Sequence, residues 1–297
     1  MPLEDLIIRI YLQVTKLFDE VCGDMRFRKG GRMPALTDPE TITIGLFGEI
    51  MGKGSDKEIY DYTRTHWGEW FPKLGSRTNF IRQTANLWRI KQLIMEKLSA
   101  ENTHNQDLYL FDGFPMPICH PKRVQRRKTD LGDKAAFGFC AAKELHYFGF
   151  KGHILTTQKG AIKGFEMTPA HVDERPVLRE LCDKLEGGDV FADKGLISTE
   201  LTQSLAAKGI NPHTPLRKNM PDPRPTEFVS QMMNIRRKVE TVIGQLVGRF
   251  HIQTIRAKTS FTHQAKVIRK LLAHSIAFSI TLSLSPDNPL QFDTLTS

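Results

Sequence analysis

The sequence predicts a mixed α/β fold, in which a helical region precedes a domain built on a mixed sheet. Apolar residues recur at helical spacing through the first hundred residues, whereas short apolar runs alternate with helical stretches after a polar break at 101–106. A chain of 297 residues is long enough for about two domains. We therefore expect a helical domain at 1–103, an α/β (α+β) domain at 104–285 and a tail at 286–297.

The helical region begins with an amphipathic helix, whose apolar positions are Leu6, Ile7, Ile10, Val14, Leu17 and Phe18. A second helix is expected to begin after Thr37 and to run to about Met51. Thr is a residue type that caps helices with its side-chain oxygen, and Pro39 lies in the first turn, where backbone N–H groups are left unpaired in any case. Further helices are expected at 56–65, 76–88 and 91–98.

The sheet domain opens with the apolar run Leu108–Phe111, which ends at Asp112. We interpret this run as a buried strand that delivers a carboxylate at its exit. Another strand, at 189–192, ends in the same way at Asp193. The remaining strands are expected at 147–157, 161–168 and 210–216, and the helices at 173–185, 198–209, 226–250 and 260–283.

The chain carries a surplus of basic residues, with 42 Lys and Arg against 33 Asp and Glu, and thus a net charge of +9. The surplus is concentrated in two stretches, 120–134 with a net charge of +4 and 208–258 with a net charge of +7. Either stretch alone is as consistent with a solvated surface as with a binding site. Because the two stretches flank the candidate chemistry, we favour a groove that binds the phosphates of a polyanion.

Composition argues against several other classes of protein. A hydrophobic content of 40% and a charged content of 25% are typical of a globular chain and not of a disordered one. We find no apolar run of about 18 residues, so no membrane partner is expected. The four cysteines lie far apart without a C-x-x-C pair, which excludes a zinc ribbon and favours free thiols in a reducing compartment. Glu4 and Asp5 argue against a secretory leader, so we expect a cytoplasmic protein.

Three carboxylates form the candidate catalytic site. Asp112 and Asp193 follow strands, and Glu240 lies on the helix expected at 226–250, at the border of its apolar face. Oxygen ligands without a nearby His or Cys suit Mg²⁺ or Mn²⁺ better than zinc or copper. Two such ions about 3.5–4 Å apart stabilise both the attacking and the leaving oxygen in phosphodiester chemistry. The alternatives are that each aspartate forms a turn or a cap, and that Glu240 pairs with Arg236 or Arg237.

Basic residues near these carboxylates are the candidate DNA contacts. They are Lys122, Arg123, Arg126, Arg127, Lys128, Lys151, His153, Lys194, Arg236 and Arg237. Lys151 and His153 share one side of a strand, which is equally consistent with a half-exposed strand face, and Lys194 is equally consistent with a solvated side chain. Asp189 is a rival of Asp193, but it is expected at the opposite end of the same strand.

Several segments resemble DDE transposases of bacterial insertion sequences. They are LFDGFPMPIC at 110–119, YFGFKGH at 147–153, ADKG at 192–195, RRKVETV at 236–242 and RTNF at 77–80. They are most similar to the insertion-sequence nine-eighty-two family, which is related to the insertion-sequence four and five groups. The resemblance implies a ribonuclease-H-like catalytic core in which Asp112, Asp193 and Glu240 bind Mg²⁺, with Mn²⁺ as an alternative. It also implies that region 1–103 recognises element ends, and a homodimer or higher multimer on DNA in a bacterial nucleoid.

We therefore expect a transposase that cuts double-stranded DNA at element ends and joins the freed 3′-hydroxyl to target DNA. A metal-dependent nuclease or Holliday-junction resolvase on the same core is a second hypothesis, because it would use the same carboxylates. A third hypothesis is a decayed, non-catalytic DNA-binding protein. The sequence departs from the family pattern at Gly113, where a Ser is expected, and at Leu196, where an aromatic residue is common.

Overall fold

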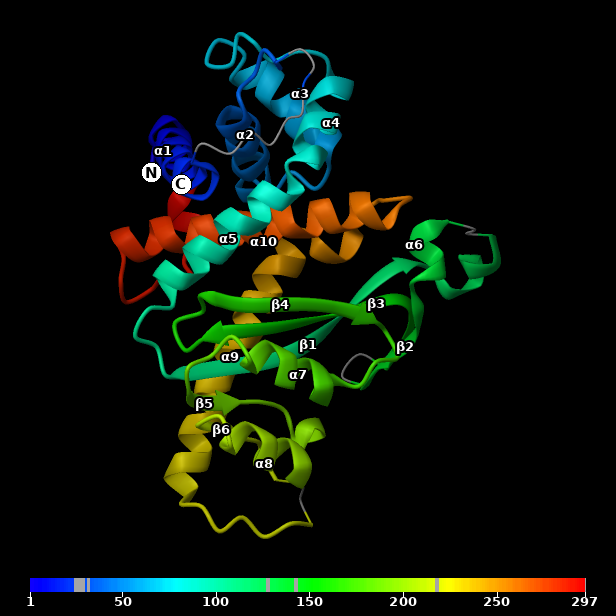
Figure 1. Ribbon diagram of the computed structural model, residues 1–297, viewed down its shortest axis with the longest axis vertical. Coiled ribbons are helices and arrows are strands. Elements are labelled where there is room, and N and C mark those ends of the chain that lie inside the picture. Colours follow the sequence, from blue (N-terminus) through cyan, green and yellow to red (C-terminus); the bar gives the residue numbers. More distant parts are fainter. Residues whose placement is uncertain (24–29, 31–32, 127–128, 142–143, 217–218, 297) are drawn as a thin grey trace. The chain divides into compact units, whose positions relative to one another are not determined.

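The computed structural model describes the chain except for residues 24–29, 31–32, 127–128, 142–143, 217–218 and 297 (Figure 1). The described residues form two compact units. Unit 1 contains Met1–Glu101, Thr129–Leu131 and Gln245–Ser297, and unit 2 contains Asn102–Lys128 and Gly132–Gly244. In the sequence, unit 2 is thus inserted between the two main parts of unit 1.

Unit 1 is helical, as predicted for its amino-terminal part. Its longer helices are α1 (Leu3–Cys22), α2 (Asp38–Ile50), α3 (Asp56–His66), α4 (Arg77–Asn86), α5 (Trp88–Asn102) and α10 (Ser260–Leu284). The predicted cap of α2 is confirmed, because the Thr37 hydroxyl accepts a hydrogen bond from the Glu40 N–H and the Glu40 carboxylate accepts one from the Thr37 N–H. Ser55 and Glu58 begin α3 in the same way.

The carboxy-terminal helix α10 is the core helix of unit 1. All its residues from Val267 to Phe278 are buried, and it packs against α2. We expected this helix in the sheet domain, but its apolar side chains find their partners among the amino-terminal helices, a long-range pairing that local periodicity does not show. Among the described residues, α10 alone is long and apolar enough to cross a membrane. Of that apolar stretch, 78% is buried inside the protein, as in the core helix of a globular fold.

A cluster of charged side chains lies inside unit 1, between α2, α3 and α10. The fully buried Glu49 carboxylate accepts hydrogen bonds from Arg269 Nε at 2.8 Å and from Lys270 Nζ at 2.7 Å. Arg269 also donates to Asp56, whose carboxylate pairs with Lys266 Nζ at 2.8 Å. Each of these charges therefore has a partner of opposite sign, as burial requires.

The described residues of unit 2 form a six-stranded mixed sheet. Its strands are β1 (Leu108–Cys119), β2 (Ala136–Cys140), β3 (Leu145–Thr157), β4 (Ile162–Pro169), β5 (Gly188–Phe191) and β6 (Ile210–His213). Their order is β2-β3-β1-β5-β6, and β4 also pairs with β3. β3 is antiparallel to β1, β2 and β4, whereas β1, β5 and β6 run parallel to one another.

Helices cover both faces of this sheet. α7 (Glu174–Cys182) and α8 (Thr199–Ala206) pack on one face, where Phe111, Leu178 and Leu205 belong to one buried cluster. α9 (Thr226–Gly248) packs on the other face, where the ring of Phe228 meets that of Phe191 edge to face, with 6.4 Å between the ring centroids. Antiparallel strands followed by two parallel strands, each preceded by a helix, are the ribonuclease-H-like arrangement that the resemblance implies.

Strand β1 is longer than predicted. It does not end at Asp112 but runs on to Cys119, although Pro115 and Pro117 lie in it. β5 pairs with β1 only as far as Leu110, so a proline nitrogen beyond that point can face the open side without the loss of a ladder hydrogen bond. Asp112 therefore lies inside β1, at the point where its neighbour β5 has already ended.

The other strands follow the prediction with two differences. β3 and β4 are confirmed, as is the turn between them, in which Gly160 has a φ of +96°. β2 was not predicted, because its five residues, AFGFC, combine alternating phenylalanines with a central glycine that weakens a strand pattern. β6 ends at His213 and not at 216, ahead of Pro215.

Candidate active site

The two predicted strand-end aspartates lie side by side in unit 2. Leu110 of β1 pairs with Phe191 of β5 in parallel register, so Asp112 and Asp193, each two residues further along an extended chain, lie level with each other. Because residues two apart in an extended chain share a face, both aspartates project from the face that α9 covers. Strand order and register thus bring together the first two carboxylates of the predicted site.

Arg236 of α9 links these two aspartates. Its Nη2 atom lies 3.6 Å from Asp112 Oδ2 and 3.6 Å from Asp193 Oδ1, so the two oxygens are no more than twice this distance apart. The Arg236 side chain is 12% exposed, and its buried Nε has no hydrogen-bond partner among the described residues. A guanidinium between two carboxylates offsets part of their mutual repulsion, which keeps them close to each other.

Glu240, the third predicted carboxylate, does not join the pair in this structure. It lies one turn after Arg236 on the same stripe of α9, but its side chain is exposed. Within the described part of the chain, no group of three or more His, Cys, Asp or Glu side chains is arranged to hold a metal ion. Two members of the predicted triad are therefore adjacent, and the role of the third stays a prediction.

Burial dominates the electrostatics of Asp112. Loss of water contacts raises the pKa of its carboxyl to about 6. Arg236 and the Gly113 N–H, which donates to Asp112 Oδ1 at 2.8 Å, oppose this rise of the pKa, whereas Glu174 and Asp193 add to it. A partly desolvated carboxyl beside a charged partner is typical of a functional site.

Glu174 is an acidic neighbour of this site that the sequence reasoning missed. It is the first residue of α7, and its Oε1 lies 3.3 Å from Lys151 Nζ. A Cβ on Gly113 would approach the same oxygen to 2.8 Å, a contact that the flexible Glu174 side chain can relieve by moving. Asp173 followed by Glu174 does mark a helix start in the sequence. No local pattern, however, shows which strand that helix start will face.

The structure places Lys151 and His153 within the sheet domain. His153 is fully buried, its Nε2 lies 2.9 Å from Thr168 Oγ1, and its ring stacks on that of Phe111. Burial, together with the smaller effect of the positive charge of Lys151, lowers the pKa of His153 to about 4. A buried, neutral imidazole offers no contact to a DNA phosphate, so we withdraw the predicted role of His153. Lys151 pairs with Glu174 and remains partly exposed.

The predicted basic cluster at 122–128 is described only in part. Lys122 and Arg123 are exposed on the 3₁₀-helix Pro121–Arg126. The side chain of Arg126, like Arg127 and Lys128, lies outside the described residues. These five residues therefore stay predicted DNA contacts.

Two further basic residues directly follow Asp193 and Arg236 in the sequence. Lys194 comes directly after Asp193 and Arg237 directly after Arg236, and both side chains are exposed. The rival acid Asp189 lies at the start of β5, where its Oδ1 accepts hydrogen bonds from Asn211 Nδ2 at 3.2 Å and from the His213 ring at 3.1 Å. Asp189 thus belongs to a separate polar group at the other end of the strand.

Comparisons with known proteins identify the family of the chain and its fold. Residues 102–260, more than half of the chain, match a family described as the transposase DDE domain. The fold is similar to that of the piggyBac transposase in a cryo-EM structure of its synaptic complex with hairpin DNA, with a TM-score of 0.50. That similarity covers 96% of this chain and 76% of the other at 10% sequence identity, so it shows a shared fold. No curated protein matches the chain.

Proposed function

Because the chain belongs to the transposase DDE domain family, we propose that it cuts double-stranded DNA at the ends of a bacterial insertion sequence of the nine-eighty-two type and joins the freed 3′-hydroxyl to target DNA. The proposal assigns Asp112, Asp193 and Glu240 to the catalytic site. All three lie within the matched residues 102–260. The shared fold with a transposase that forms a synaptic complex with DNA supports DNA as the substrate.

Transposases of this family use divalent metal ions, and the donor chemistry of the site fits such an ion in part. Asp112 and Asp193 present carboxylate oxygens around a shared cationic group, and hard oxygen ligands suit Mg²⁺ or Mn²⁺. These two residues would hold the ion, and Glu240 is the proposed third ligand. When bound, a divalent ion activates the attacking oxygen and stabilises charge on the leaving oxygen.

The basic residues of the site position the carboxylates and the DNA. Arg236 keeps the two aspartates close together where β5 ends beside β1. Lys194 and Arg237 are exposed beside them, where they would contact phosphates. The predicted cluster at 122–128 would extend the phosphate contacts along the duplex. We further propose a dimer or higher multimer on DNA, which light scattering of the protein–DNA complex tests.

The observation that carries the proposal is the contact of Asp112 and Asp193 with one guanidinium. The test uses a donor plasmid that carries the coding sequence with its flanking DNA, incubated with Mg²⁺ and a target plasmid. Asp112→Asn, Asp193→Asn and Glu240→Gln should each abolish both cleavage and joining. Asp189→Asn, at the other end of β5, is the matched control and should keep both activities. Wild-type cleavage by all three folded variants would refute the assignment.

The two alternative functions give different products in the same assay. A nuclease or resolvase on this core would cleave the donor but leave no joined product. A decayed DNA-binding protein would bind DNA with a steep salt dependence and cleave under no condition. The exposed side chain of Glu240 is an observation that this last alternative would explain.

A further inference from the structure

Helix α4 and its flanking segments form a basic surface of unit 1 that no acidic residue interrupts. No Asp or Glu occurs between Glu69 and Glu96. Within this stretch the exposed charges are all positive: Lys73, Arg77, Arg82 and Arg89. Because these cations have no acidic neighbour in the sequence between 70 and 95, this stretch is electrostatically suited to a polyanion.

The exposed side of α4 also carries groups that read bases. Asn79, Arg82 and Asn86 follow one another at spacings of three and four residues, which places them on one side of the helix. All three side chains are exposed, and Arg82 Nη2 donates to Asn79 Oδ1 at 3.2 Å. We call these three residues the α4 reading face. Paired amide donors and acceptors match the edge of adenine, and a guanidinium matches the edge of guanine.

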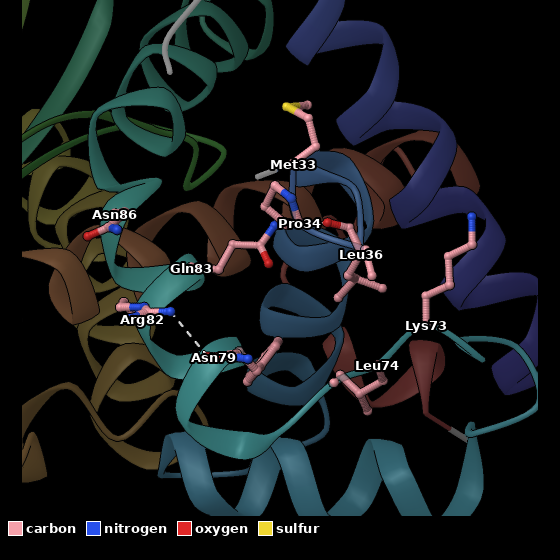
Figure 2. Close-up of a pocket in the computed structure, with 12 residues that line it drawn as sticks. Met33, Pro34, Leu36, Lys73, Leu74, Asn79, Arg82, Gln83 and Asn86 are labelled. Atoms are coloured by element: carbon pink, nitrogen blue, oxygen red, sulfur yellow. Dashed lines mark hydrogen bonds between the residues drawn. The ribbon is translucent and has the colours of Figure 1, made fainter. Parts of the chain in front are cut away.

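A pocket of about 520 Å³ keeps this side of α4 open to a ligand (Figure 2). Asn79, Arg82 and Asn86 line one wall, while Met33 and Pro34 line another, with Lys73 at its border. Within the described part of the chain, the three reading side chains are thus exposed and line this open pocket. Figure 2 also shows Gln83 directed toward the opposite wall, where its Nε2 donates to Leu36 O and Asp38 Oδ1, each at 3.0 Å. Gln83 therefore fixes the segment that borders the pocket.

The opposite side of α4 anchors it to unit 1. Phe80 and Thr84 are buried, and Lys91 of α5 donates to the Thr84 carbonyl oxygen at 2.6 Å. Ser76 caps the helix through a hydrogen bond from the Asn79 N–H. Substitution of the exposed side chains at 79, 82 and 86 therefore leaves the packing of this helix intact.

We propose that the α4 reading face binds the major groove of duplex DNA and recognises base sequence, while Arg77, Arg89 and Lys73 contact the flanking phosphates. The inference rests on the proposed function, because it supplies that function with its sequence-reading site. An acidic peptide would satisfy the four cations but not the two amides, so the mixture of groups favours DNA. Phosphate contacts give affinity, and contacts to base edges give specificity.

The test begins with selection of binding sequences by the full-length chain from a pool of random 20-base-pair duplexes, in buffer with EDTA so that no cleavage occurs. A preferred sequence is expected to emerge. On this sequence, Asn79→Ala, Arg82→Ala and Asn86→Ala should each weaken binding by about 5- to 140-fold and relax the preference at particular base pairs. Tryptophan fluorescence and circular dichroism verify that each variant is folded.

Phosphate contacts give a different signature. Arg77→Ala and Arg89→Ala should weaken binding to all sequences alike, and each should lower the slope of log affinity against log salt by about one. Arg9→Ala, an exposed arginine on α1, is the matched control and should bind the selected sequence as the wild type does. A surface for acidic peptides only would show no enriched duplex at all.

The inference is overturned if no sequence is enriched, or if the Asn79→Ala/Asn86→Ala double variant retains the wild-type preference. Its failure is distinguishable from failure of the proposed function. Enrichment that depends on α4 without any cleavage in Mg²⁺ would refute the catalytic proposal and leave the reading face supported. Cleavage at specific ends by the double variant, with unchanged sequence preference, would refute the reading face and leave the catalytic proposal supported.

Discussion

Replacement of Glu49 by Gln should unfold unit 1 at a much lower denaturant concentration. The Glu49 carboxylate has no exposed surface, and it neutralises Lys270, which is 1% exposed, and part of Arg269, which is 3% exposed. Glutamine keeps the shape and one acceptor oxygen but removes the negative charge. Arg269 still has Asp56 as a partner, whereas Glu49 is the only carboxylate that pairs with Lys270 among the described residues.

Loss of one partner from a buried ion pair costs about 3–5 kcal/mol, because the remaining charge is left uncompensated. This is a large part of the roughly 5–15 kcal/mol by which domains are stable. If the free energy of unfolding falls by about 2 kcal/mol per molar urea, the urea concentration at the unfolding midpoint of unit 1 should fall by about 1.5–2.5 M. The double variant Glu49→Leu/Lys270→Met removes both charges and should recover most of this loss.

Tryptophan fluorescence measures unit 1 alone, because all three tryptophans of the chain lie in it: Trp67, Trp70 and Trp88. The matched control is Asp61→Asn, which removes the same charge from the exposed pair Lys57–Asp61 and should cost less than about 0.5 kcal/mol. If Glu49→Gln unfolds within the error of Asp61→Asn, the buried cluster does not stabilise unit 1 and the reasoning is wrong.

Three other predictions concern single groups or ions. Burial lowers the pKa of His274 to about 3, so its imidazole stays neutral in the native state, whereas in the unfolded state it binds a proton below about pH 6.5. The free energy of unfolding of unit 1 should therefore fall by about 2–3 kcal/mol between pH 7 and 4.5, which urea unfolding measures. Gly188→Ala should disrupt β5, measured by hydrogen exchange, because φ is +108° and a Cβ would lie 2.2 Å from the Asp107 carbonyl oxygen. EDTA should abolish DNA cleavage but leave DNA binding, measured by gel shift.

Each of these predictions has its own control. His274→Gln keeps a polar side chain without a titration near neutrality, so an acid sensitivity equal to that of the wild type would exclude His274 as its source. Gly209→Ala has the same kind of strained backbone, with a φ of +71°, but no atom within 4 Å of the added Cβ. Equal exchange in the two glycine variants would show that the close approach to Asp107 is unimportant. Cleavage that persists in EDTA would contradict a metal-dependent site.

The sequence predicts the order of the catalytic elements better than their depth in the protein. Apolar runs that end on Asp112 and Asp193 are visible locally, and the strands they mark are parallel neighbours. The exposure of Glu240 depends on how α9 is rotated about its axis against the sheet. Helical periodicity shows which side of α9 is apolar, but not on which side of that border a residue such as Glu240 lies. The alternation of residues around His153 is consistent with a half-exposed strand face, because alternation does not show that a helix will cover that face.

Contacts between residues distant in the sequence explain the remaining differences between the predicted and the observed structure. The helix at 260–284 has a clear apolar pattern, but nothing in that pattern says that its partners lie more than two hundred residues earlier, at Glu49 and Asp56. Glu174 lies near Asp112 for the same kind of reason, because a helix and a strand distant in sequence meet only in the folded sheet. Local patterns therefore located the elements, and their tertiary partners required the structure.

The insertion of unit 2 within unit 1 constrains how the chain is made. On the ribosome, helices α1 to α5 emerge first, but the helix that fills their core begins only at Ser260. At about 5–20 residues per second, roughly ten to thirty seconds of synthesis separate the two parts. During this interval the apolar surfaces of the early helices have no permanent cover, so nascent chains should depend on chaperones until α10 appears. For the same reason, a fragment that stops at residue 101 is not a substitute for unit 1 in binding experiments.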